Sequence, residues 1–120
     1  MPSKGFTMRF RALAIFATLG AFSANAREPW GGYGLGAEGC GTYVEQRRVP
    51  DKAYDNFMVS WFFGFVSAYN YWAAPQVEGE VDQDTVLAYL DKYCRDAPLA
   101  SVSAGALELA KTLSKRRSSP

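Results

Sequence analysis

The sequence contains no histidine and only two cysteines, Cys40 and Cys94, among its 120 residues. The absence of histidine removes the commonest general base of enzymes and the usual Ser/His and Cys/His catalytic arrangements. Two cysteines without histidine also fall short of the usual ligand sets of a zinc site. We therefore expect no catalytic residue, no metal site and no cofactor, and we interpret the chain as a non-enzymatic protein.

The sequence also lacks a strong excess of charge of either sign. It has 13 lysines and arginines against 12 aspartates and glutamates. Three of the basic residues lie within residues 1–26, so the rest of the chain has ten basic and twelve acidic residues and a net charge of about −2. A nucleic-acid-binding protein would carry a concentrated basic face, and we expect no nucleic-acid partner.

Residues 1–26 have the pattern of a secretory signal peptide. A positively charged start precedes an apolar stretch at residues 12–22 and the small-residue sequence Ala-Asn-Ala at residues 24–26. The apolar stretch is too short to remain as a membrane anchor. We therefore expect cleavage after Ala26 and a mature chain that is periplasmic or secreted.

In an exported protein, an even number of cysteines indicates a disulfide bond. A Cys40–Cys94 bond would stabilise the fold by roughly 4 kcal/mol in the chain-entropy treatment; two buried free thiols are the alternative. The bond also argues against a membrane span between the two cysteines, because a span would place them on opposite sides of the membrane. We expect no membrane span in the mature chain.

Charged residues are absent from Asn56 to Val77, and this stretch holds eight of the 14 aromatic side chains that follow residue 26. A helix that is apolar nearly all round is either covered by other helices or spans a membrane, and the shorter amphipathic segments on both sides favour covering. On a helix, Ser60, Gly64 and Ser67 form a stripe of small residues. This stripe predicts a shallow groove where a second helix crosses closely.

A domain of this size has little surface with which to cover every aromatic side chain of its central helix, and an uncovered strip would mark a binding site. We predict a partner-binding surface formed by Trp61, Phe65, Tyr69 and Trp72, with core packing as the alternative. A buried Asn70 must be hydrogen-bonded. It either ties the helix to a neighbouring loop or lies at a partner-facing surface.

The remaining patterns predict three more helices and no strand. Asp51 and Asp82 are suitable residues at the starts of the second and third helices, and Pro75 ends the second. The expected helices cover residues 41–48, 51–74, 83–97 and 98–113, the last with Leu99 in its apolar stripe. Between the second and third, the alternating carboxylates Glu78, Glu80, Asp82 and Asp84 indicate a solvated loop and helix start, with loose calcium binding as the alternative.

The expected organisation is a signal peptide at residues 1–26, a flexible glycine-rich segment at 27–39, a helical domain at 40–114 and a basic polar tail at 115–120. The glycine-rich segment gains little from burial and loses much entropy on ordering. The fold class is therefore all-α, a small four-helix bundle around a central aromatic helix, stapled by one disulfide.

Two short motifs around the cysteines resemble those of small exported proteins of the HdeA/HdeB type. These proteins have a cysteine followed by an aromatic residue three positions later, as in Cys40-Gly-Thr-Tyr43. They then have Tyr-Cys-basic-x-x-Pro before a last helix, as in Tyr93-Cys94-Arg-Asp-Ala-Pro98, and the two cysteines are bonded. The resemblance implies a periplasmic acid-stress chaperone that binds unfolding client proteins.

A third motif, Gly64-Phe-Val-Ser-Ala68, is similar to a segment of the Tai-type immunity proteins, which neutralise effectors of type VI secretion. These are also small, helical, periplasmic and cysteine-bonded. This resemblance implies a protein that binds one specific effector enzyme. A third hypothesis is a helical periplasmic protein with another binding role. A homodimer is compatible with each of these three functions.

The first two readings differ in one observable property. A chaperone of the first kind would expose its aromatic helix in acid, because its twelve carboxylates protonate below roughly pH 4 and move the net charge from about −2 to about +10. A folded inhibitor would bind through a surface that is already formed at neutral pH.

Overall fold

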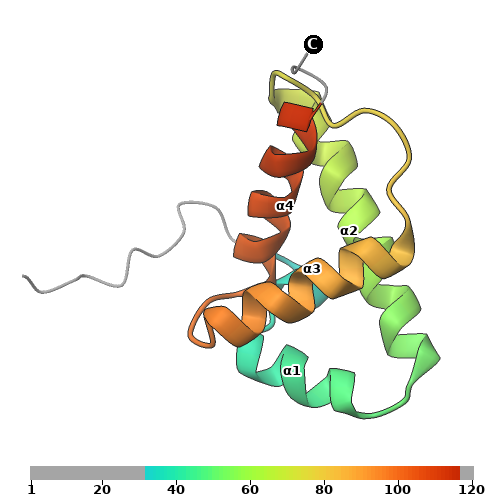
Figure 1. Ribbon diagram of the computed structural model, residues 1–120, viewed down its shortest axis with the longest axis vertical. Helices are drawn as coiled ribbons and strands as arrows, with labels where there is room; N and C mark the ends of the chain where they lie inside the picture. The colour runs from blue at the N-terminus through green and yellow to red at the C-terminus, as the bar shows by residue number, and fades with distance from the viewer. Residues whose placement is uncertain (1–31, 117–120) are drawn as a thin grey trace, which may run out of the picture.

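The computed structural model describes residues 32–116, which fold into four α-helices and a short 3-10 helix (Figure 1). These elements are η1 (Gly34–Ala37), α1 (Cys40–Arg48), α2 (Lys52–Trp72), α3 (Gln83–Asp96) and α4 (Val102–Arg116). The expected all-α four-helix fold with one disulfide is confirmed. The predicted signal peptide and residues 117–120 of the predicted tail lie outside the described residues.

Aspartate side chains cap α2 and α3, as the sequence predicts. Asp51 accepts a hydrogen bond from the Ala53 amide at 2.9 Å. Asp82 accepts one from the Thr85 amide at 2.8 Å and another from the Thr85 hydroxyl at 2.6 Å. Each cap satisfies an amide that the helix leaves unpaired and is typically worth about 1 kcal/mol.

The start of α4 differs from the expected position. The helix begins at Val102 rather than near Pro98, because Ala100 donates back to the Ala97 carbonyl in a turn and the Ser101 hydroxyl then caps the amide of Ala104. Leu99 lies at this turn and is fully exposed, so its predicted place in the apolar stripe is wrong. At its other end α4 continues to Arg116 and takes in the first two residues of the predicted tail.

The disulfide joins the start of α1 to the end of α3, and both cysteines are buried. An isolated antiparallel bridge between Gly39 and Ser101 fixes the same corner. There the Cys40 amide donates to the Ala100 carbonyl at 2.8 Å, and the Val102 amide donates to the Glu38 carbonyl at 2.9 Å. Segments that are far apart in the sequence are therefore held together at one end of the bundle.

The close helix crossing predicted on α2 occurs on α4 instead. A Cβ atom added at Gly105 would lie 2.7 Å from a ring carbon of Tyr93 on α3, so only glycine lets the two helices approach this closely. Ser60, Gly64 and Ser67 are all exposed, and a Cβ added at Gly64 would meet no atom within 4 Å. The prediction of close packing at this stripe is therefore wrong for the described residues.

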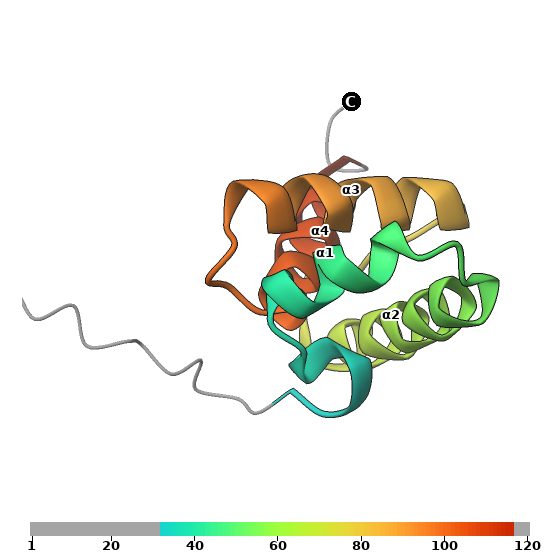
Figure 2. The same ribbon diagram turned by 90° about the horizontal axis from the view of Figure 1, so that it is seen from below.

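Contrary to the flexibility expected over residues 27–39, the described part of the glycine-rich segment, residues 32–39, is folded; residues 27–31 lie outside the described residues. Its η1 turn packs against α2 and α4, and Figure 2 shows it at the base of the bundle beside α2. A Cβ added at Gly36 would lie 1.7 Å from the Trp61 ring, and the Trp61 indole N–H donates to the Tyr33 carbonyl at 2.9 Å. The absence of a side chain at Gly36 makes room for the indole, which compensates for the entropy of ordering this segment.

Candidate functional site

One side of α2 is left uncovered by the rest of the described chain. Four large aromatic side chains on this side are exposed: Phe57 by 66%, Phe63 by 39%, Tyr71 by 77% and Trp72 by 85%. We call this surface the outer face, and it comprises Phe57, Ser60, Phe63, Gly64, Ser67, Ala68, Tyr71 and Trp72, all of them exposed.

Helical periodicity separates the outer face from the core. Phe57, Gly64 and Tyr71 follow one another at seven-residue steps, which is close to two helical turns. Met58, Val59 and Phe62 lie on the opposite side and are buried. Since no charged residue occurs between Asn56 and Val77, the outer face is an uncharged strip over most of the roughly 30 Å length of α2.

The predicted partner surface is largely taken up by the fold. Trp61, Phe65 and Tyr69 are half-buried and pack against the core. The rings of Trp61 and Phe65 stack with centroids 5.5 Å apart, and η1 covers Trp61. Of the four predicted residues only Trp72 is exposed, and its ring lies edge-on to that of Tyr71 with a centroid distance of 4.8 Å.

Asn70 ties α2 to the loop that follows it, which is one of the two roles predicted for it. Its side-chain amide donates to the Val77 carbonyl at 2.8 Å, and its side-chain oxygen accepts from the Val77 amide at 2.7 Å. The Gln76 side chain also donates to the Asn70 carbonyl at 2.7 Å. These bonds hold the loop against the end of α2, and Val77 is buried there.

A hollow of about 540 Å³ lies between the outer face and this loop. It is lined by Phe63 from α2 and by Gly79, Glu80, Val81 and Asp82 from the segment that leads into α3. In Figure 1 the loop runs back alongside α2 before α3 begins. The hollow therefore combines an exposed aromatic ring with acidic side chains.

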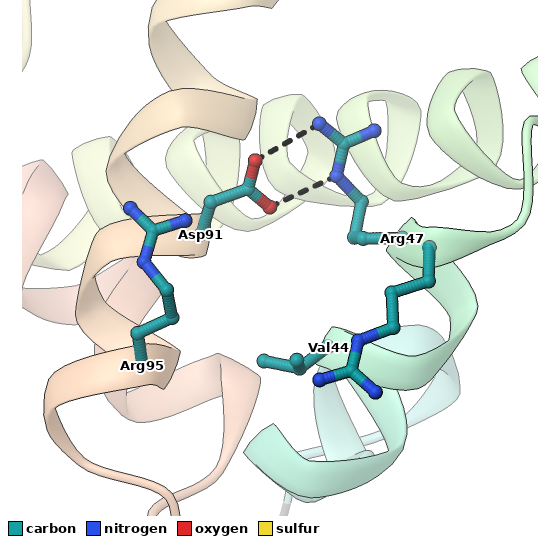
Figure 3. A pocket seen from close by; sticks show the side chains of 5 residues that line it. Val44, Arg47, Asp91 and Arg95 are labelled. Atoms are coloured by element: carbon teal, nitrogen blue, oxygen red, sulfur yellow. Dashed lines mark hydrogen bonds and ion pairs between the residues drawn. The ribbon is translucent and has the colours of Figure 1, made fainter.

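A second hollow, of about 290 Å³, lies between α1 and α3 and is lined by Val44, Arg47, Arg48, Asp91 and Arg95 (Figure 3). Arg47 donates two hydrogen bonds to the Asp91 carboxylate, at 2.9 and 3.0 Å, and a third to Asp55 on α2 at 2.6 Å. The buried Tyr43 hydroxyl also donates to Asp91 at 2.9 Å. One arginine therefore connects three helices.

The pKa values of these groups follow from their contacts. Burial alone would raise the pKa of Asp91, but the hydrogen bonds from Arg47 and Tyr43 outweigh it and lower that pKa. The hydrogen bond to Asp91 also raises the pKa of Arg47, and burial followed by the charge of Asp91 raises the pKa of Tyr43. The pair is therefore held in its charged form at neutral pH, and its donors and acceptors are already satisfied within the fold.

The arrangement of this second hollow fits a structural tie between helices rather than a reactive centre. Arg47 is paired with Asp91 and Asp55, and Arg48 is paired with Glu45 at 2.8 Å. Within residues 32–116, no three or more His, Cys, Asp or Glu side chains are grouped so as to hold a metal ion, and the alternating carboxylates of the predicted loop form no such group. Among the described helices, none has the length and apolar character needed to span a membrane.

Sequence reasoning missed three residues of the outer face, Phe57, Phe63 and Tyr71. The sequence contains no separate signal for them, because small residues such as Ser60 and Gly64 on the same side of the helix are equally expected at a close helix crossing. Which side of α2 is exposed depends on the glycine-rich segment. This segment covers Trp61, and no other part of the described chain covers the outer face.

Comparison with known proteins gives no relative. No family model, curated protein or solved structure matches the chain.

Proposed function

We propose that this chain is a non-enzymatic, exported protein-binding protein that binds its partner through the outer face of α2. The observation that carries this proposal is the uncharged strip with four exposed aromatic side chains. The largest apolar patch on a soluble monomer is often an interaction site. The Cys40–Cys94 bond supports export, because disulfides persist in oxidising compartments.

The size of the outer face fits a protein partner. At their exposed fractions, the four aromatic side chains offer about 500 Å² of surface, taking roughly 200 Å² for each whole side chain. A complex that covers them would bury about 1,000 Å² over both partners, which reaches the lower limit for a specific protein interface. Tyrosine and tryptophan are also the residue types that most often dominate such interfaces.

The outer face is exposed in the folded chain, which supports a binder that acts as folded. A partner enzyme, as the likeness to immunity proteins implies, would meet a preformed surface and would not require acid. Unfolding client proteins, as the likeness to acid chaperones implies, would be bound by the same aromatic side chains after the bundle loosens.

Site-specific photo-crosslinking in the cells that export the protein tests the proposal. A photoreactive phenylalanine analogue at Tyr71 is expected to form a protein adduct at neutral pH, because this side chain is exposed on the outer face in the last turn of α2. The matched control places the analogue at Thr112, which is exposed on α4. Equal adducts at both positions, or none at Tyr71, would contradict binding through the outer face.

The acid-chaperone reading remains a second candidate because of the Arg47–Asp91 contact. This contact links α1 and α3 while the carboxylate of Asp91 is ionised. Acid that protonates Asp91 would weaken the contact between these helices, which would expose additional apolar surface. Protection of a client protein from aggregation below about pH 4, absent at pH 7, is the result that would favour this candidate.

A further inference from the structure

The hollow beside Phe63 places acidic side chains at the edge of the otherwise uncharged outer face. Glu80 and Asp82 line it together with the partly exposed ring of Phe63. Asp82 is engaged as the cap of α3. Glu80 is exposed, and no lysine or arginine of the described chain forms an ion pair with it.

The stretch of sequence that lines this hollow is rich in acidic residues. Residues 53–91 contain six acidic residues and no lysine or arginine. Two of the six, Asp55 and Asp91, are paired with Arg47 at the α1 end of the bundle. Three of the other four, Glu80, Asp82 and Asp84, lie at the end of the loop and at the start of α3. Two of these, Glu80 and Asp82, line the hollow, so this part of the edge carries acidic side chains.

We propose that the partner is a protein segment with an arginine or lysine set among apolar side chains, and that this cation occupies the hollow between Phe63 and Glu80. This inference rests on the proposed function and names the chemistry of the partner. The face of an aromatic ring attracts a cation, and a carboxylate forms a charge-assisted hydrogen bond with it. The apolar side chains of the partner would cover Phe57, Tyr71 and Trp72.

Charge complementarity favours a basic and apolar protein segment as the partner of the outer face over a second copy of this chain and over a membrane surface. A second copy of the chain would bring the same outer face and loop, which have no basic residue to place in the hollow. A membrane surface that carries anionic lipids would be repelled by the acidic loop. A basic and apolar protein segment satisfies both the charge and the aromatic surface.

Selection from a displayed library of random peptides tests the inference without knowledge of the natural partner. The oxidised protein is used as bait beside Glu80→Gln, which removes the charge in the hollow. The matched control is Asp84→Asn, which removes one charge from the same acidic region but does not line the hollow. A fourth bait, Phe57→Ser/Tyr71→Ser, removes two exposed rings of the outer face.

We expect the unaltered protein and Asp84→Asn to select peptides with an arginine or lysine between apolar residues. Glu80→Gln is expected to select the apolar residues without the basic one. In the best peptide, replacing the arginine by citrulline is expected to weaken binding to the unaltered protein about tenfold, as the loss of one charge-assisted contact predicts. Binding to Glu80→Gln is expected to change less than twofold.

The contrary outcomes separate this inference from the proposed function. If every bait selected apolar peptides without a basic residue, the proposed cation site would be contradicted, and the proposal of binding through the outer face would stand. No enrichment over Phe57→Ser/Tyr71→Ser would overturn both. Concentration-dependent dimerisation that Phe57→Ser/Tyr71→Ser abolishes, or binding of zwitterionic phosphatidylcholine vesicles that the same variant abolishes, would replace the proposed partner by a second copy or by a lipid surface.

Discussion

At the scale of single residues, two helical glycines have opposite surroundings, one in the first turn of α4 and one in the interior of α2. Gly105 lies where α4 crosses α3, with its missing Cβ only 2.7 Å from the Tyr93 ring. Gly64 lies on the outer face, where a Cβ would meet nothing within 4 Å. Glycine is costly in a helix by about 1 kcal/mol relative to alanine, so only Gly105 has a packing reason for its presence.

This contrast gives a matched pair of substitutions. Gly64→Ala is expected to raise the free energy of unfolding by about 0.5–1 kcal/mol, because it improves helix propensity without a clash. Gly105→Ala is expected to lower it by about 1–2 kcal/mol, because Tyr93 and Leu90 must move. Urea unfolding of the oxidised protein measures both, and changes of the same sign would show that the crossing at Gly105 is misplaced.

At the scale of elements, the glycine-rich segment decides which side of α2 is covered. Its η1 turn lies on Trp61 because Gly36 has no side chain, and Tyr33 accepts the indole hydrogen bond. Without this segment, Trp61 and Phe65 would be as open to solvent as the sequence reasoning expected. Residues 32–39 therefore pack as part of the domain.

Gly36→Ala is expected to detach η1 from α2, because the new methyl group would lie 1.7 Å from the Trp61 ring. Tryptophan emission should shift to longer wavelength and residues 32–38 should become sensitive to proteases, with a loss of stability of about 1–3 kcal/mol. Gly39→Ala is the control, since a Cβ there meets nothing within 4 Å. Equal behaviour of the two variants would contradict the packing of η1 on Trp61.

Sequence patterns predicted those parts of the fold that depend on local chemistry. Asp51 and Asp82 cap α2 and α3, and Asn70 pairs with the following loop, because each of these contacts lies within a few residues of the chain. The exposure of Leu99 and the exposed side of α2 depend instead on which distant segment packs where. Periodicity placed the aromatic side chains around α2, but it could not show that η1 covers Trp61 while Ser60 and Gly64 stay exposed.

At the scale of the whole molecule, three helices are linked by the Arg47–Asp91 and Arg47–Asp55 pairs and two by the disulfide. The covalent bond does not respond to pH, whereas the Arg47–Asp91 pair does. Since the fold lowers the pKa of Asp91, this carboxylate stabilises the fold at any pH above its unfolded value of about 3.9. That contribution is lost as the pH falls through the lowered folded value.

Asp91→Asn is therefore expected to reduce the free energy of unfolding by roughly 2 kcal/mol at pH 7, and to reduce it less as the pH falls below about 4. The stability curve of the variant should accordingly be flatter in acid than that of the unaltered protein. Asp84→Asn is the control, since Asp84 is exposed and forms no ion pair within the described chain. Denaturant unfolding at stepped pH measures the three curves, and parallel curves for Asp91→Asn and the unaltered protein would exclude this role.

The proposed function requires that the apolar surface of the outer face is exposed in the folded protein at neutral pH. The most direct measurement is the fluorescence of an apolar-surface dye with the oxidised protein from pH 7 to pH 2, beside the Phe57→Ser/Tyr71→Ser variant. We predict dye binding at pH 7 that is largely lost in the variant while its helical circular dichroism is unchanged. Dye binding that is negligible at pH 7, equal in both proteins and strong only below about pH 4 would contradict the preformed surface and favour acid-triggered exposure.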